Sequence, residues 1–236
     1  MIKILQTLIK GFRINLEIKK WLNGIDHEKI SLGQNCNAAF YLKENNCKNA
    51  SYPFDWIFSS GEIVLHAIKD DFTIFLDERN ITDVNGNRAG HEFYHSYLFN
   101  HKSPLKKENR LYYKRCINRF RNILNSEKHI VFVCFVINEH KKRISWAKGF
   151  NREIKLPINQ NIHDFKELIS SISSIHNNSK FIFINQLTEG KIDLKFQFYK
   201  KNILWIDFVS KGENTGLKYI NRVDHKIIKL IFNGLR

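Results

Sequence analysis

The chain has 236 residues, of which 43% are hydrophobic and 13% aromatic, so it can bury one substantial core and is neither disordered nor fibrous. The formal net charge is +15, but no helix-turn-helix, zinc-finger or aromatic RNA-binding motif accompanies the basic residues, so specific nucleic-acid binding is not expected. The charge instead predicts a general attraction to anionic substrates or anionic surfaces.

Residues 1–25 are predicted to form a basic amphipathic helical segment ahead of a single α/β domain at 26–236. Isoleucine and leucine residues recur near helical spacing among Lys3, Lys10 and Arg13. Two interpretations are open: the helix packs on the domain, or it lies on an anionic membrane. No stretch resembles a signal peptide or a membrane span. We therefore expect a cytoplasmic protein, with peripheral contact at the inner face of the membrane as the alternative.

The next residues predict a strand, a tight turn and a helix. The strand covers 29–32, the turn is at Gly33, and the helix starts at Gln34 or Asn35 and continues through Leu42. Further along, residues 57–69 have helical periodicity, and the aromatic-rich stretch 92–99 is typical of a strand or an extended segment.

The second half of the chain alternates helices with continuous apolar strands. Helices are predicted at 112–124, 164–175 and 222–232, and buried strands at 129–137, 180–185 and 203–209, with 194–199 as an antiparallel partner of the last strand. Such strands separated by helices indicate a single α/β domain with a largely parallel central sheet that is flanked by helices.

Cysteine usage points to one residue. The four cysteines form no CxxC pair and no framework of short spacings, so we expect free thiols, no structural metal and a reducing compartment. Cys36 occupies the predicted first turn of a helix, where backbone N–H groups favour the thiolate, and Gln34 or Asn35 supplies an amide for an oxyanion. The alternative is that Cys36 is a small buried hydrophobic residue. That alternative suits the other cysteines better, namely Cys47, Cys116 and Cys134.

A nucleophilic cysteine needs a general base, and the segment 90–97 supplies His91 and His95, with His101 just beyond it. Zinc binding by His91 and His95 is the less favoured interpretation because no third ligand is nearby in sequence. Asp55, between Phe54 and Trp56, either orients a histidine or makes a structural hydrogen bond. Further candidates are Asn138 as an orienting residue and the weak Asp224–His225 pair near the C-terminus.

The residues Ser31-Leu32-Gly33, Cys36, Ala39 and Leu42, followed by Tyr52-Pro53-Phe54-Asp55-Trp56, resemble the opening signature of an uncharacterised bacterial family described as papain-like cysteine peptidases. The resemblance implies Cys–His chemistry, a papain-like α+β fold as the alternative to the parallel sheet, and a context among genes for surface-polysaccharide assembly. The family has a His-Asp pair where this chain has His95-Ser96, which makes His95 the preferred base.

These observations lead to two functional hypotheses. The first is a Cys-dependent acyl-transfer enzyme, a hydrolase or transferase of surface glycans, with Cys36 as nucleophile, His95 as base, Asp55 or Asn138 orienting it and Gln34 stabilising the oxyanion. No cofactor or metal is expected. The second is a glycan- or nucleotide-binding module or glycosyltransferase-like protein, in which the Gly33 turn binds a phosphate and Cys36 is incidental.

Overall fold

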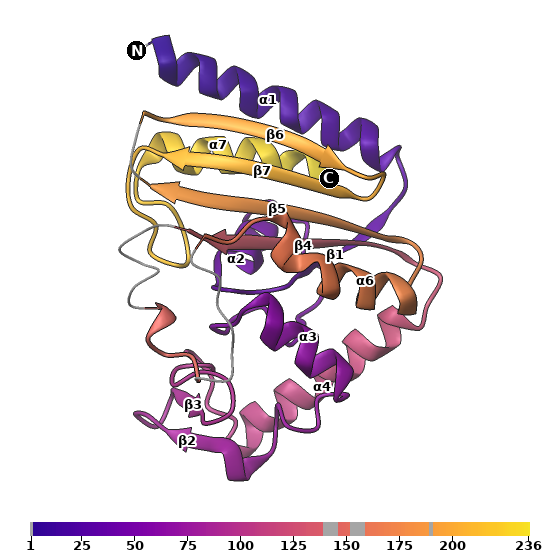
Figure 1. Cartoon of the computed structure of the whole chain (residues 1–236), viewed down its shortest axis with the longest axis vertical. Coiled ribbons are helices and arrows are strands. Elements are labelled where there is room, and N and C mark those ends of the chain that lie inside the picture. The colour runs from indigo at the N-terminus through magenta and orange to yellow at the C-terminus, as the bar shows by residue number, and fades with distance from the viewer. Residues whose placement is uncertain (1, 139–145, 152–158, 189–190) are drawn as a thin grey trace.

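The computed structural model describes residues 2–138, 146–151, 159–188 and 191–236, and its central element is a five-stranded sheet (Figure 1). The strand order is β1-β4-β5-β7-β6; the first four strands are parallel and β6 pairs antiparallel with β7. The predicted largely parallel α/β sheet is confirmed. The strands are β1 (His27–Ser31), β4 (His129–Ile137), β5 (Ser179–Thr188), β6 (Asp193–Tyr199) and β7 (Ile203–Ser210).

Helices cover both faces of this sheet (Figure 1). One layer contains α3 (Gly61–Lys69), α4 (Lys107–Leu124) and α6 (Lys166–Ile175). The opposite layer contains α1 (Ile2–Leu22), α2 (Asn37–Glu44) and α7 (Arg222–Phe232). Short 3₁₀ turns lie at Glu78–Asn80, Ile162–Phe165 and Asn233–Leu235.

The pleat of β4 explains why one strand serves two cores. Successive side chains of a strand point to opposite faces, so Phe132 joins the core under α3 and α4 whereas Val133 joins the core under α2 and α7. The eight apolar residues from Ile130 to Ile137 therefore fill both sides. The predicted bounds 129–137 and 222–232 match β4 and α7.

Segment 92–99 differs from the prediction. Its aromatic residues do not form a strand; only Ala89–His91, immediately before it, is one (β3), paired with Ile81–Asp83 (β2) in a small antiparallel sheet. The backbone turns back where His91 N donates to the carbonyl of His95. Tyr94 and Phe99 are instead completely buried in the core under α3, whereas Tyr97 is exposed.

The helix α1 packs on the domain along one face. Ile14 and Ile18 are completely buried in the core with α7, and Asn15 Nδ2 donates to the carbonyl of Leu230 at 2.7 Å. Met1 lies outside the described residues, and the division at residue 25 stays a prediction. Of the helices that the structure describes, none combines the length and apolar content needed to cross a bilayer.

Candidate active site

Cys36 lies where the chain leaves β1 and enters α2, at the carboxyl edge of the parallel strands, the usual position of ligand sites in such sheets. The turn depends on Gly33, whose φ of +82° is in the left-handed region. A Cβ at this position would lie 2.3 Å from Ser59 Oγ, the same oxygen that accepts a hydrogen bond from Gln34 N. Only glycine fits both the conformation and the space.

Gln34 supports the turn from inside rather than facing a substrate. It is completely buried, its Oε1 accepts from Ile137 N at 2.8 Å, and its Nε2 donates to Gln160 Oε1 at 2.7 Å. Because its amide is engaged with β4 and with Gln160, the predicted role of Gln34 as an oxyanion donor does not match its placement.

Asn35 offers the amide that Gln34 does not. Its Oδ1 accepts from Asn37 N at 3.0 Å, which fixes the orientation of the amide. Its Nδ2 is buried and has no hydrogen-bond partner among the described residues. A buried N–H group without an acceptor lowers the stability of the fold. Asn35 Nδ2, one residue before Cys36, is therefore available to donate a hydrogen bond to a ligand.

The side chain beside Cys36 is His101. The Cys36 Sγ lies 3.4 Å from His101 Nε2, across a sequence separation of 65 residues. Cys36 is 4% exposed, whereas His101 is exposed. The structure therefore forms a Cys–His pair, with the histidine that follows the predicted segment 90–97 rather than one inside it.

The ionisation of this pair differs from the prediction of a thiolate. Burial, and to a smaller extent the charge of Asp55, raises the pKa of the Cys36 thiol to about 12. Partial desolvation also lowers the pKa of His101, although the residue as a whole is exposed, with a smaller contribution from Arg88. The field of the short helix α2 favours the thiolate, but desolvation of the nearly buried sulfur is the larger effect. At neutral pH the pair is a thiol beside a neutral imidazole.

His95, the preferred base from sequence, has both ring nitrogens engaged elsewhere. Its Nδ1 accepts from Tyr97 N and its Nε2 lies 3.0 Å from the carbonyl oxygen of Trp146. These partners fix a neutral tautomer with the proton on Nε2, and burial lowers the pKa of His95 to about 4. His95 consequently has no free lone pair for a proton from Cys36.

The remaining predicted residues are also held by local partners. His91 is buried, and its Nε2 lies 3.0 Å from the carbonyl oxygen of Ile74. Asp55 is completely buried; its Oδ2 lies 2.5 Å from Lys48 Nζ and accepts from Tyr52 N. Burial raises the pKa of Asp55, and Lys48 opposes that increase. Asn138 bonds to Gln160 and Asn185. The partners of His91 and Asp55 are thus Ile74, Lys48 and Tyr52 rather than Cys36 or His101.

The other cysteines and the C-terminal pair have structural surroundings. All four cysteines are free and buried, and burial raises the pKa values of Cys47, Cys116 and Cys134. His225 Nδ1 lies 3.0 Å from Tyr41 Oη, and Asp224 accepts from Lys211 N and Gly212 N. Among the described residues, no group of three histidine, cysteine or acidic side chains forms a metal site.

The family described as "Putative papain-like cysteine peptidase (DUF1796)" matches residues 27–190. The chain belongs to this family. Membership supports a Cys-dependent hydrolase, and the matched region runs from β1 to the end of β5, including both Cys36 and His101. No curated protein and no solved structure matches the chain.

His101 carries little signal in the sequence. It stands outside the aromatic histidine-rich segment, and no spacing rule connects it to Cys36. The small antiparallel sheet brings it back, because Ala89 and Phe99 exchange backbone hydrogen bonds and so return the chain toward the end of β1. The one feature of the sequence that points to His101 is its position as the next histidine after His91 and His95.

Proposed function

We propose that this protein is a Cys-dependent acyl-transfer enzyme, a hydrolase or a transferase, in which Cys36 is the nucleophile and His101 the general base. The observation that carries the proposal is the 3.4 Å separation of Cys36 Sγ and His101 Nε2 at the carboxyl edge of the sheet. A nucleophile and a base within reach of each other are the minimum for covalent acyl transfer.

The neutral pair sets the order of proton transfer. His101 Nε2 takes the thiol proton as Cys36 Sγ forms a bond to the acyl carbon, and the carbonyl electron pair moves onto oxygen. Collapse of this intermediate breaks the bond to the leaving group, which receives the proton from His101. Water, or an acceptor hydroxyl, then loses a proton to His101 and attacks the thioester, and Cys36 regains its proton. This cycle resembles that of a serine enzyme more than that of a preformed thiolate.

The developing oxyanion needs donors in the turn. Asn35 Nδ2 is the proposed side-chain donor, because it is buried and unpartnered among the described residues and its amide is oriented by Asn37 N. Ala38 N and Ala39 N are further candidate donors, since the first turn of a helix has no carbonyl partners for its N–H groups; Asn37 N already donates to Asn35 Oδ1. Gln34 then has a positioning role, because it fixes the turn to β4.

The proposed substrates are bacterial surface glycans or their precursors. The family resemblance supports this context, and the net charge of +15 suits the anionic groups that many such polymers carry. Hydrolysis and transfer differ only in whether water or a sugar hydroxyl accepts the acyl group from Cys36.

An acylation experiment tests the proposal. The protein is incubated with p-nitrophenyl acetate, and acetylated cysteines are located by peptide mass spectrometry. Acetylation is expected at Cys36 in preference to Cys47, absent in Cys36→Ala and strongly slowed in His101→Ala. His163→Ala removes an exposed histidine elsewhere and is the matched control. Unchanged acetylation of Cys36 in His101→Ala, with the fold intact by circular dichroism, would favour the binding-module hypothesis.

A further inference from the structure

A surface hollow of about 550 Å³ lies between α2 and α4. Its walls come from the end of α2, the segment that includes the Tyr52–Trp56 motif, and the exposed side of α4. The lining residues that matter here are Lys43, Lys48, Trp56, Tyr112, Arg115 and Arg119.

This hollow is cationic, and only one of its basic side chains is neutralised by an ion pair with a described residue. Four basic and no acidic side chains are among its lining residues. Lys48 is paired with the buried Asp55, but among the described residues no carboxylate lies within ion-pair distance of Lys43, Arg115 or Arg119. Arg119 is also oriented, because its Nη1 donates to the carbonyl of Ser51 at 3.0 Å.

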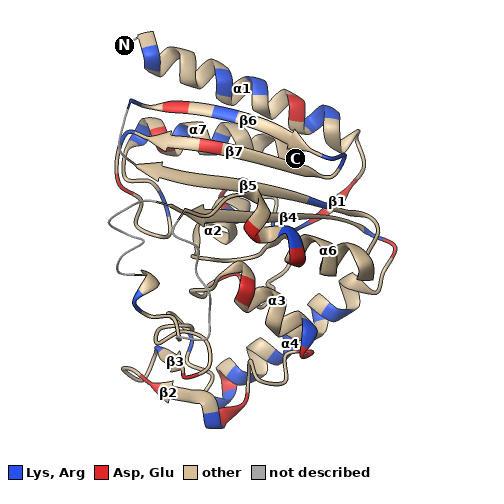
Figure 2. Cartoon of the chain, in the orientation of Figure 1, with Lys and Arg blue, Asp and Glu red and all other residues tan. Residues whose placement is uncertain are grey.

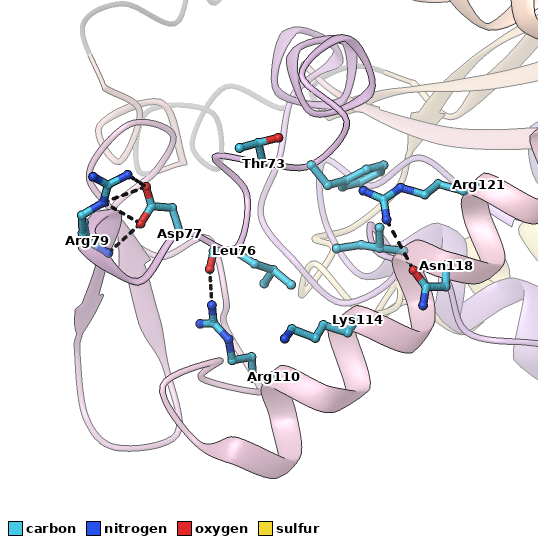
Figure 3. Close-up of a pocket in the computed structure, with 10 residues that line it drawn as sticks. Thr73, Leu76, Asp77, Arg79, Arg110, Lys114, Asn118 and Arg121 are labelled. Atoms are coloured by element: carbon cyan, nitrogen blue, oxygen red, sulfur yellow. Dashed lines mark hydrogen bonds and ion pairs between the residues drawn. The ribbon is translucent and has the colours of Figure 1, made fainter.

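A second cationic hollow, of about 480 Å³ on the other side of α4, shows the contrast (Figure 3). There Arg79 pairs with Asp77, Arg110 with Glu78 and Arg121 with Asp71, so most of its positive charge is already balanced. Only Lys114 of its lining cations has no acidic partner among the described residues. Both hollows are therefore lined by four basic residues, but within the described part of the chain most of these are paired in the second hollow and unpaired in the first.

One contact and the helix α2 relate the first hollow to the Cys36–His101 pair. The Nζ of Lys102, the residue after His101, lies 3.8 Å from the centre of the Tyr112 ring. Lys43 stands seven residues after Cys36 on α2, which is about 10 Å along a helix. The hollow and Cys36 therefore lie at the two ends of the same short helix.

We propose that this hollow binds the anionic group, a phosphate or carboxylate, of a glycan substrate. Arg115 and Arg119 form charge-assisted hydrogen bonds to the anion, and the Trp56 indole offers an apolar surface to the adjoining sugar ring. That the ligand is a substrate rests on the proposed function. The anion-binding site itself does not, because Cys36 takes no part in it.

Direct binding tests the site without any reaction. Isothermal titration with glucose 1-phosphate, glucuronate, inorganic phosphate and glucose is performed on the native protein and on Cys36→Ala. We expect both proteins to bind the two anionic sugars, inorganic phosphate to bind more weakly, and glucose not to bind. The relative affinities of the two sugars show whether phosphate or carboxylate is preferred.

The matched variants are Arg115→Gln and Lys114→Gln, which remove one exposed charge from adjacent positions of α4 and face different hollows. Arg115→Gln is expected to weaken binding about tenfold or more, whereas Lys114→Gln leaves it unchanged. Equal losses in both variants, or no binding of any anion, would overturn the site. Binding that persists while the acylation experiment fails would separate this inference from the proposed function.

A different observation, on α1, supports a second inference. Besides its buried face, α1 carries a continuous apolar stripe, consisting of Ile2, Leu5, Ile9, Phe12 and Leu16, which are each between 50% and 74% exposed. Ile9 and the buried Ile18 stand nine residues apart, which places them on opposite sides of a helix. The stripe therefore faces away from the domain, and a patch of this kind on a protein surface marks an interaction site.

Basic residues recur along α1 (Figure 2). The helix contains five lysines and arginines and one glutamate, so 5 − 1 gives it a net charge of +4. Lys10 is paired with Asp193, and the others extend along the flanks of the stripe. Long basic side chains beside an apolar stripe reach to lipid phosphates while their stems lie on the acyl boundary.

We infer that the exposed stripe of α1 lies on an anionic bilayer surface. Charge decides against a second copy of this chain, because pairing two such helices would bring two +4 surfaces together, in a chain whose total charge is already +15. Anionic lipids neutralise the same charges. This orientation leaves the covered core face of α1 undisturbed.

Vesicle sedimentation tests this inference. We expect the protein to sediment with phosphatidylglycerol vesicles and not with phosphatidylcholine vesicles, and high salt to release it. The variant Leu5→Gln/Ile9→Gln/Phe12→Gln is expected to stay in the supernatant. The control Leu111→Gln/Ile175→Gln removes exposed apolar residues from other helices and is expected to sediment normally. A native protein that is dimeric by light scattering, becomes monomeric in the triple variant and ignores the vesicles would overturn the inference.

Discussion

Lys48 Nζ and Asp55 Oδ2 are 2.5 Å apart, and their side chains are 8% and 0% exposed. The pair sits between the Tyr52–Trp56 motif and the cationic hollow, so the most recognisable sequence motif of the chain is anchored by a buried ion pair. Removing one partner of such a pair leaves a charge buried and uncompensated, which costs much more than replacing both partners with apolar groups.

Asp55→Asn is therefore expected to lower the free energy of unfolding by about 3–5 kcal/mol. The double variant Asp55→Asn/Lys48→Met is expected to recover much of that loss, because no charge is left in the interior. Urea denaturation monitored by tryptophan fluorescence measures both values. Acetylation of Cys36 in folded Asp55→Asn should stay close to normal, since Asp55 contacts Lys48 and Tyr52 rather than a histidine. A stable variant with lost acetylation would assign Asp55 an orienting role instead.

The pH dependence of Cys36 alkylation follows from its raised pKa. Only the thiolate reacts with iodoacetamide, and with a pKa of about 12 the thiolate fraction at neutral pH is small. The rate is expected to rise about tenfold per pH unit from pH 6 to pH 9, without a plateau. Mass spectrometry of timed samples gives this rate for each cysteine. A plateau at acidic and neutral pH would show a preformed thiolate–imidazolium pair and would change the order of proton transfer proposed above.

The rate of acyl transfer with His101 as the base is expected to depend on pH differently from the rate of alkylation. His101 must be neutral to accept a proton, and partial desolvation lowers its pKa below the usual value near 6.5. Acetylation by p-nitrophenyl acetate should therefore be nearly independent of pH just above 6.5 and should decline only as the pH falls through the lowered pKa. The measurement is the initial rate of p-nitrophenol release between pH 4.5 and pH 8. A rate that depends on pH with the slope of the alkylation reaction would show that His101 does not participate.

The regular elements were accessible to sequence analysis because they depend on local patterns. The apolar run of β4 begins and ends where the strand does, and the helical periodicity of α7 covers the same residues as the helix. The antiparallel pairing of β6 with β7 was accessible for the same reason, since Lys200 and Lys201 separate two apolar segments at a short turn. These features need no knowledge of what lies elsewhere in the chain.

The site depends on relationships that local patterns do not contain. Cys36 was identifiable from its turn, but burial reverses the direction of its pKa relative to the helix-terminus argument. Its partner His101 comes from a segment without regular structure, positioned by the bridge between Ala89 and Phe99. Nearness to Cys36, two residues further on, predicts a chemical role for Gln34, whereas the left-handed backbone at φ +65° turns its side chain toward β4.

His95 gives the last prediction, on stability against pH. The fold binds this ring in its neutral form, between Tyr97 N and the Trp146 carbonyl, and its pKa is lowered to about 4. In the unfolded chain the pKa is about 6.5, so the unfolded state binds the proton first as the pH falls. Stability from this residue is therefore complete above pH 6.5 and decreases progressively down to about pH 4, by up to about 3 kcal/mol.

His95→Gln is expected to be less stable at pH 7, because Phe150 loses its ring contact, but to lose less stability than the native protein between pH 7 and pH 5. Urea denaturation at each pH measures the two slopes, with His163→Gln as a control that retains the native slope. Equal slopes in native protein and His95→Gln would show that His95 does not titrate in this range.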